Sequence, residues 1–298
     1  MRPRPPALHA ETPLERLTPA ERLNFLLTNR IPRRAATRFM GWFSKLEHPL
    51  LARASIALWQ RFADDLRLFE ARQRHFRSLH ECFIRELKAG VRPVDLDPAV
   101  LASPCDAEVG AFGELKGLEA LQAKGFPYGV EELLGDRRLA ERYRDGRYLT
   151  LRLKSSMYHH FHAPLKGQTH EIVYHSGDTW NVNPIALRVV ERLFCRNERA
   201  VIEYRTEGES LLLVPVAAVL VASMHFSGVD VPLNLRYRGP NRIPWAQTFE
   251  KGQEMGYFEH GSTIILITTK GFQFHGGVET GKIVRMGSRL MTRCQDDA

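Results

Sequence analysis

The sequence predicts an α+β protein in which N-terminal amphipathic helices precede a β-rich domain, barrel-like or sandwich-like. Two observations support this fold class. Apolar residues recur at helical spacing through the N-terminal part of the chain. From about Val91 onward, turn residues separate short runs that are rich in β-branched and aromatic side chains. We therefore divide the 298 residues into a helical region, 1–90, and a β-rich domain, 91–298.

The helical region is expected to begin with a capped helix. Thr18, Pro19 and Glu21 supply an N-cap, a proline at the first helical position and the acidic residue of a capping box. Further helices are predicted over 33–46, 50–69 and 78–88. The segment 33–46 mixes arginines with Phe39 and Trp42, and so allows two interpretations. It either packs on its own domain or lies at a lipid surface with its aromatic side chains among the headgroups.

Short strands and two helical inserts are expected in the remainder of the chain. The strands are predicted over 148–153, 171–174, 199–204, 211–221, 263–269 and 282–286, and the inserts near 130–143 and 184–194. The longest apolar run, 211–224, contains Pro215 and is shorter than the roughly 18 residues that a membrane-spanning helix needs. This run is therefore predicted to be buried β-structure.

The charge of the chain favours an anionic partner. The net charge is +8 and the isoelectric point about 9.5. The basic residues are dispersed and form no compact block interleaved with aromatic residues, so an anionic membrane surface is favoured over nucleic acid. The four cysteines are far apart and form no C-x-x-C pair, which indicates a reducing, intracellular setting. Residues 1–23 lack the apolar core of a signal peptide.

Three segments carry side chains suited to catalysis: Ser-Pro-Cys-Asp at 103–106, Tyr-His-His-Phe-His at 158–162 and His-Gly-Ser-Thr at 260–263. Each alone has an ordinary interpretation as a turn, a strand start or a set of hydrogen-bonded histidines. Together they suggest a serine that loses its proton to a neutral histidine, which a carboxylate orients. Ser262 is not in a G-x-S-x-G elbow, which disfavours an ordinary serine hydrolase.

A metal site is the alternative use of the histidines. If 158–162 is a strand, His160 and His162 share one face and His159 points away. Imidazole is a common zinc ligand, so His160 and His162, with a further ligand such as His175, would suit a zinc-dependent hydrolase.

The same segments, in this order, resemble the phosphatidylserine decarboxylase family. The resemblance runs from about Phe83 to Met291. It rests on Phe-Ile-Arg-Glu-Leu at 83–87, Arg-Pro-Val-Asp at 92–95, Ser-Pro-Cys-Asp-Ala at 103–107, Leu-Gln-Ala-Lys-Gly at 121–125, Tyr-His-His-Phe-His-Ala-Pro at 158–164, Asn-Pro at 183–184, Asn-Glu-Arg at 197–199, Lys-Gly-Gln-Glu-Met-Gly-Tyr-Phe at 251–258 and Gly-Ser-Thr at 261–263. Many ordered matches are more specific than any single triplet.

The resemblance implies a proenzyme that cuts itself between Gly261 and Ser262. Ser262 would attack the Gly261 carbonyl, with His162 as base and Asp106 orienting it. Elimination and hydrolysis would then convert Ser262 into a pyruvoyl group with loss of ammonia. The products would be a β chain, 1–261, and an α chain that begins at the former Ser262, held together in one catalytic fold.

The resemblance also implies the reaction. The pyruvoyl group would form a Schiff base with the amine of phosphatidylserine and take up electrons as CO₂ leaves, giving phosphatidylethanolamine without pyridoxal phosphate and with no metal expected. His159 is the candidate acid that returns a proton to carbon. The expected location is peripheral, on the cytoplasmic side of a cell membrane, with a phospholipid as substrate. Formation of a homodimer is left open by the sequence.

Three positions depart from the family pattern. His260 stands where the family commonly has Leu, Cys105 replaces Ala, and Ala107 replaces Gly. None removes a proposed catalytic group, so we expect activity to survive. A non-catalytic lipid-surface protein with an inactive decarboxylase fold is the remaining alternative.

Overall fold

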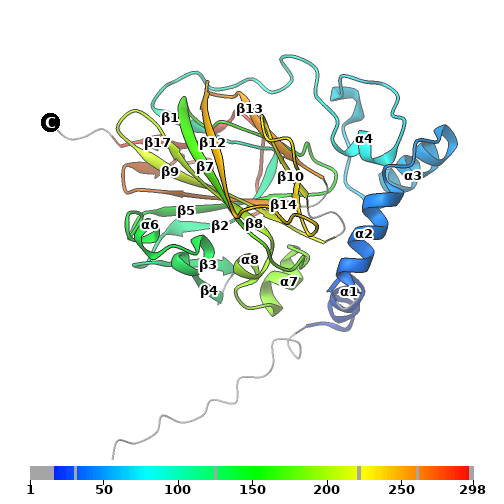
Figure 1. Ribbon diagram of the computed structural model, residues 1–298, viewed down its shortest axis with the longest axis horizontal. Helices are drawn as coiled ribbons and strands as arrows, with labels where there is room; N and C mark the ends of the chain where they lie inside the picture. The colour runs from blue at the N-terminus through cyan, green and yellow to red at the C-terminus, as the bar shows by residue number, and fades with distance from the viewer. Residues whose placement is uncertain (1–16, 30–31, 124–125, 220–222, 260–261, 295–298) are drawn as a thin grey trace, which may run out of the picture.

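The computed structural model describes residues 17–29, 32–123, 126–219, 223–259 and 262–294. Four N-terminal α-helices are followed by a β-rich body, and α1 to α3 lie along one side of that body (Figure 1). The helices are α1 (Pro19–Asn29), α2 (Arg33–Phe43), α3 (Pro49–Phe62) and α4 (Leu79–Phe83), with a 3₁₀ turn at Leu68–Glu70. The sequence predicts that helices come first and strands follow, and the structure has this order. The α+β fold class is therefore confirmed.

The start of α1 is the predicted capping box. The Glu21 amide donates to Thr18 Oγ1 at 3.3 Å, and the Thr18 amide donates to Glu21 Oε2 at 3.0 Å. Two backbone amides at the helix end are thus satisfied by side chains. The predicted helix 50–69 is too long, since α3 ends at Phe62 and the chain turns at Arg67, which has a φ of +48°.

The strands form four antiparallel sheets. The largest has eight strands in the order β12 (Arg242–Phe249), β7 (Gly167–His175), β8 (Arg199–Arg205), β9 (Ser210–Ala217), β14 (Ser262–Thr268), β5 (Arg147–Leu153), β2 (Ala107–Glu114) and β16 (Ile283–Val284). A four-stranded sheet has the order β11 (Leu233–Asn234), β10 (Ser223–Phe226), β13 (Glu254–Phe258) and β6 (His160–His162). A three-stranded sheet has the order β1 (Val100–Ala102), β17 (Arg289–Arg293) and β15 (Phe272–Phe274). A two-stranded sheet pairs β3 (Glu119–Ala123) with β4 (Phe126–Gly129). No sheet closes into a barrel within the described ranges.

Strand β14 lies in the middle of the hydrophobic core. Ile264 and Leu266 belong to one apolar cluster, on the side of the three-stranded and four-stranded sheets, whereas Ile265 and Ile267 belong to a second cluster, on the side of helices α5 to α8. All seven residues of the strand are buried. A strand covered on both faces needs a continuous apolar run, which is why this segment does not alternate in the sequence.

The two predicted helical inserts are each a pair of short helices. The first is α5 (Val130–Leu134) and α6 (Arg137–Glu141), and the second is α7 (Pro184–Val189) and α8 (Leu193–Arg196). Gly135 separates the first pair with a φ of +66°, and Asp136 then caps α6 by accepting from the Leu139 amide at 3.0 Å. Among the described helices, none has the length and apolar character required to span a bilayer.

Candidate active site

Ser262 is the first residue of β14 and is fixed from both sides. It pairs with Leu153 in β5 and with Ala217 in β9. The residue is fully buried, and its Oγ has no hydrogen-bond partner within the described part of the chain. Buried hydroxyls are usually hydrogen-bonded, so this one is a candidate for chemistry. Gly261, the other predicted cleavage residue, and His260 lie outside the described residues.

His159 lies beside the strand that leads to Ser262. The Phe258 amide donates to the His159 carbonyl oxygen at 3.0 Å, at the end of β13. Strands β5 and β14 belong to the eight-stranded sheet and β6 and β13 to the four-stranded sheet, so the chain changes between the same two sheets after β5 and after β13. The histidine segment is thereby bonded to β13, and the next strand along the chain begins at Ser262.

The His159 ring is buried and held in one tautomer. Its Nδ1 lies 2.8 Å from the Met157 carbonyl oxygen, which can only accept, so Nδ1 carries the proton. The ring packs against Phe83 of α4, with 4.1 Å between ring centroids. In the neutral ring Nε2 is therefore the basic nitrogen.

His162 is held in the same tautomer by different partners. Its Nδ1 donates to the Gly252 carbonyl oxygen at 3.0 Å, and Nε2 lies 3.1 Å from the Tyr158 hydroxyl. Burial lowers the pKa of His162 below its usual value, so the ring is neutral at pH 7. Burial raises the pKa of Tyr158 well above its usual value, so the hydroxyl keeps its proton. His162 is therefore uncharged at neutral pH and can accept a proton.

Asp106 is fully buried and bound by two arginines. Its carboxylate accepts from Arg92 Nε at 2.8 Å, Arg92 Nη2 at 2.6 Å, Arg285 Nη1 at 2.9 Å and the Met286 amide at 2.9 Å. No hydrogen bond joins Asp106 to His162 among the described residues, and the Gly252 carbonyl fixes that ring instead. The loops are still adjacent, because the His162 amide donates to the Pro104 carbonyl at 2.8 Å.

Several partners in this region were not expected as functional residues. Arg92 and Tyr158 lie in segments that carry the family resemblance, so a signal for them existed. Gly252 lies in the matching segment 251–258, but nothing there indicates that its carbonyl binds a histidine. Arg285 reaches the site from a distant part of the chain, and nothing in its local sequence marks it. Arg92 also pairs with Glu70 at 2.7 Å, which ties the 3₁₀ turn before α4 to Asp106.

Two cavities border the connection 154–159, and Asp64, Lys154 and Ser156 line both. One, of about 310 Å³, is lined by Asp106 with Arg92, Arg285, Tyr158 and Met157. The other, of about 420 Å³, is lined by Leu153, Ala218, Val219, Asn181, Asn183 and Phe62. Because Leu153 pairs with Ser262 and Ala218 follows its other partner, the second cavity lies at the end of β14 where Ser262 is.

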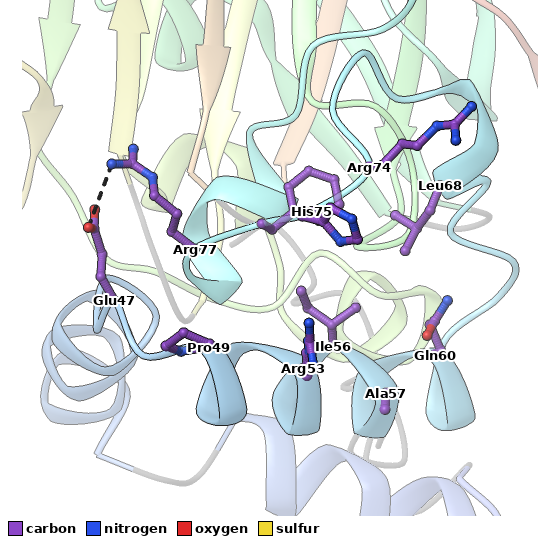
Figure 2. A pocket seen from close by; sticks show the side chains of 11 residues that line it. Glu47, Pro49, Arg53, Ile56, Ala57, Gln60, Leu68, Arg74, His75 and Arg77 are labelled. Carbon is purple, nitrogen blue, oxygen red and sulfur yellow. Dashed lines mark ion pairs between the residues drawn. The ribbon is translucent and has the colours of Figure 1, made fainter.

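A further cavity, of about 600 Å³, lies elsewhere, between α3 and the segment 68–77. Figure 2 shows Arg53 and His75 directed into this space and Arg77 directed toward Glu47, with 3.6 Å between their charged groups. Ile56 and Leu68 contribute apolar walls. This cavity belongs to the helical region and contains no predicted catalytic residue.

The histidines of the zinc alternative are engaged by protein groups. His160 Nε2 lies 2.9 Å from the Ile84 carbonyl and Nδ1 lies 3.0 Å from Glu254. His175, in β7, bonds the Leu134 carbonyl at 2.9 Å. In the described ranges no three His, Cys, Asp or Glu side chains are grouped to hold a metal ion. The zinc-dependent hydrolase is not favoured.

Comparison with known proteins points to one family. The family model for phosphatidylserine decarboxylase matches residues 79–292. The chain is 37% identical over 268 residues to the phosphatidylserine decarboxylase proenzyme of Vibrio cholerae, covering 86% of this chain and 94% of that protein. It is 33% identical over 279 residues to the proenzyme of the same name from Shewanella baltica, covering 90% and 95%. The chain therefore belongs to the phosphatidylserine decarboxylase family.

Proposed function

We propose that this protein converts phosphatidylserine to phosphatidylethanolamine with a pyruvoyl group that it makes from its own Ser262. Two features support this function. Relatives that align with nearly the whole chain are phosphatidylserine decarboxylase proenzymes. The observation that carries the proposal is the position of Ser262, a buried hydroxyl at the start of a strand that is paired on both sides.

Self-cleavage would begin with the Ser262 hydroxyl. Its oxygen attacks the carbonyl carbon of residue 261, so that a C–O bond forms as the C–N peptide bond breaks, and the hydroxyl proton passes through a base to the released nitrogen. Removal of the Cα proton of residue 262 then breaks its Cβ–O bond and frees the carboxylate of residue 261. Hydrolysis of the resulting dehydroalanine releases ammonia and leaves the pyruvoyl group.

His162 suits the role of base in cleavage. Burial keeps its ring neutral at pH 7, and the Gly252 carbonyl fixes the proton on Nδ1. The carboxylates of Glu254 and, to a smaller extent, Asp106 favour the protonated form of His162 that follows proton uptake. We assign Asp106 this electrostatic role, because its own hydrogen bonds go to Arg92, Arg285 and the Met286 amide.

The surroundings of Ser262 fit a pyruvoyl group. The α chain would begin at residue 262, and backbone pairing with Leu153 and Ala217 would hold its new end within the sheet. The group, once formed, supplies an electron sink that stabilises the charge left when CO₂ departs. We assign His159, whose ring is held by Met157 and Phe83, the return of a proton to carbon afterwards, delivered from Nε2 once that nitrogen has taken up a proton.

The helical region would hold the active site at a membrane. Large apolar side chains are exposed on α1, α2 and α3: Leu23, Leu26, Leu27, Phe39, Trp42, Leu50, Leu58 and Phe62. Exposed apolar residues on helices of a basic protein suit an anionic lipid surface. Phe62 also lines the cavity beside Ser262, so a lipid whose tails rest near the end of α3 can present its headgroup there.

Three measurements test this function together. Intact mass and a denaturing gel of the purified protein should show a break before residue 262 and an α chain with a blocked, pyruvoyl N-terminus. The same preparation should release CO₂ from phosphatidylserine vesicles. An unbroken chain of 34.1 kDa in an active preparation would overturn the proposal. An unbroken chain that binds vesicles but releases no CO₂ would support the non-catalytic alternative.

A further inference from the structure

Side chains from three elements converge on Glu259, the last described residue before the proposed cleavage bond. Lys45, just after α2, places Nζ 2.9 Å from Glu259 Oε1. His225 in β10 places Nε2 3.1 Å from the same oxygen, and His80 in α4 places Nε2 3.6 Å from it. The His80 amide also donates to the Ser44 carbonyl at 2.8 Å, which joins α4 to the end of α2.

The Glu259 carboxylate is buried and depends on these partners. Its side chain is 7% exposed, whereas that of Lys45 is 50% exposed. Burial alone would raise the pKa of Glu259, but hydrogen bonds from His225 and Lys45 lower it to about 2. The group is therefore charged at neutral pH, and a buried charge that loses its partner is strongly destabilised. Glu259 would then have to move toward solvent or take up a proton.

Glu259 and Ser262 bracket the bond that would be cut. Ser262 is fixed by strands on both sides, and the Glu259 amide is held by the Ser223 carbonyl at 3.0 Å. Only residues 260 and 261 lie between them. A nucleophile must approach the carbonyl carbon to about 3–3.5 Å, and misplacement by about 1 Å is costly in rate. Because the backbone of Ser262 is fixed at one end of this two-residue link, the position of Glu259 sets the other end.

We propose that Glu259 is a positioning residue for self-cleavage and that Lys45, His80 and His225 hold it in place. The N-terminal helical region thereby sets the rate at which the chain matures. Arg38 and Trp42 of α2 line a cavity of about 400 Å³ together with Lys45, Arg236 and Glu259, so the cluster lies beside that helix. This inference rests on the proposed function, since it takes the bond between residues 261 and 262 as the one that is cut.

The test follows maturation of the full-length chain after cell-free synthesis with a radioactive label, with the uncut and cut chains separated on denaturing gels. Glu259→Gln and Lys45→Met should each slow the loss of uncut chain by about tenfold or more. The exchanged pair, Lys45→Glu with Glu259→Lys, should recover part of the rate, because it restores opposite charges at the same two places but not the contacts of residue 259 with His225 and His80.

Arg33→Met is the matched control. Arg33 pairs with Asp178 at 2.6 Å and stacks on Trp180, so it also fastens α2 to the β-rich body, but it does not touch Glu259. This variant should mature at the unaltered rate. Equal slowing by Arg33→Met and Lys45→Met would mean that docking of α2 alone matters, and would overturn the positioning role.

The outcomes separate the two proposals. If the unaltered chain is never cut, the proposed function fails. If the unaltered chain is cut and Glu259→Gln is cut equally fast, only the positioning role fails. Thermal unfolding of each variant in an uncleavable Ser262→Ala background reports folding separately. Should Glu259→Gln fail to fold, the exchanged pair decides, and its failure to recover the rate would overturn the inference.

Discussion

The backbone carbonyl of His159 accepts a 3.0 Å hydrogen bond from the amide of Phe258. Phe258 ends β13, the strand that leads to Ser262, and Leu153, which pairs with Ser262, begins the connection that leads to His159. Two segments far apart in the sequence are thus joined at both ends by backbone contacts. The main chain at His159 is thereby bonded to the strand that precedes Ser262 by four residues.

Ser262→Ala should leave the chain uncut, because alanine has no hydroxyl to attack the carbonyl of residue 261. A denaturing gel should show full-length chain only, and CO₂ release from phosphatidylserine should fall to background. Thr268→Val, which removes a hydroxyl from the other end of β14, serves as the control and should mature normally. Complete cleavage of the Ser262→Ala chain would show that another nucleophile acts.

His159→Ala and His162→Ala should separate the two reactions. A general base or acid contributes roughly 10²–10⁴ in rate, so His162→Ala should slow maturation by at least about 10². His159→Ala should mature but decarboxylate at least about 10² more slowly. Time courses of cleavage and of CO₂ release measure each step.

A control variant and the pH dependence of the cleavage rate extend this test. The exposed His275 offers a control, His275→Ala, that should change neither rate. Because burial lowers the pKa of His162 below 6.5, cleavage of the unaltered chain should stay constant near neutral pH and decline only below about that value. The reverse pattern, an uncut His159→Ala chain and a normally cut His162→Ala chain, would exchange the two roles.

Asp106→Asn should weaken both stability and maturation. The change leaves Arg92 and Arg285 facing a neutral amide, and breaking a buried ion pair typically costs roughly 3–5 kcal/mol. The remaining pair between Arg92 and Glu70 should reduce this loss. Thermal unfolding in the Ser262→Ala background measures the first effect and a cleavage time course the second. Asp97→Asn, at a more exposed carboxylate, should change neither, and equal loss in both variants would contradict a specific role for Asp106.

Glu259 should make the folded chain sensitive to acid. Its pKa is lowered from 4.5 to about 2, so the stability it contributes is complete above pH 4.5 and is lost as the pH falls through 2. The shift corresponds to about 3 kcal/mol in the free energy of unfolding. Denaturant unfolding of the Ser262→Ala chain, with and without Glu259→Gln, should differ most near pH 7 and converge near pH 2. A difference that does not change with pH would contradict the lowered pKa.

Replacing the aromatic residues of α2 should weaken membrane attachment. Phe39 and Trp42 are 60% and 59% exposed, and transferring such side chains to the lipid interface is favourable through apolar burial. Phe39→Ser with Trp42→Ser should lower binding to anionic vesicles by about tenfold or more in a sedimentation assay. Leu96→Ser removes an apolar side chain that is 83% exposed outside these helices, and should have little effect. Equal losses in both would mean that attachment is not centred on α2.

Local patterns in the sequence determined the order of elements and much of their character. The capping box of Thr18 and Glu21 and the unbroken apolar run of β14 are short-range signals, because they depend on neighbours along the chain. The family resemblance and its candidate residues, Asp106, His159, His162 and Ser262, were also readable from the sequence. Their catalytic roles stay predictions.

Other features were decided only by the tertiary structure. Asp106 is bound by Arg92 and Arg285, and His162 takes its ring orientation from the Gly252 carbonyl instead of Asp106. Glu259 is held by side chains from α4, β10 and the end of α2. Contacts between residues so far apart follow from strand register and from the packing of helices on sheets. Such packing depends on the whole chain, and no local pattern encodes which distant groups it brings to a buried charge.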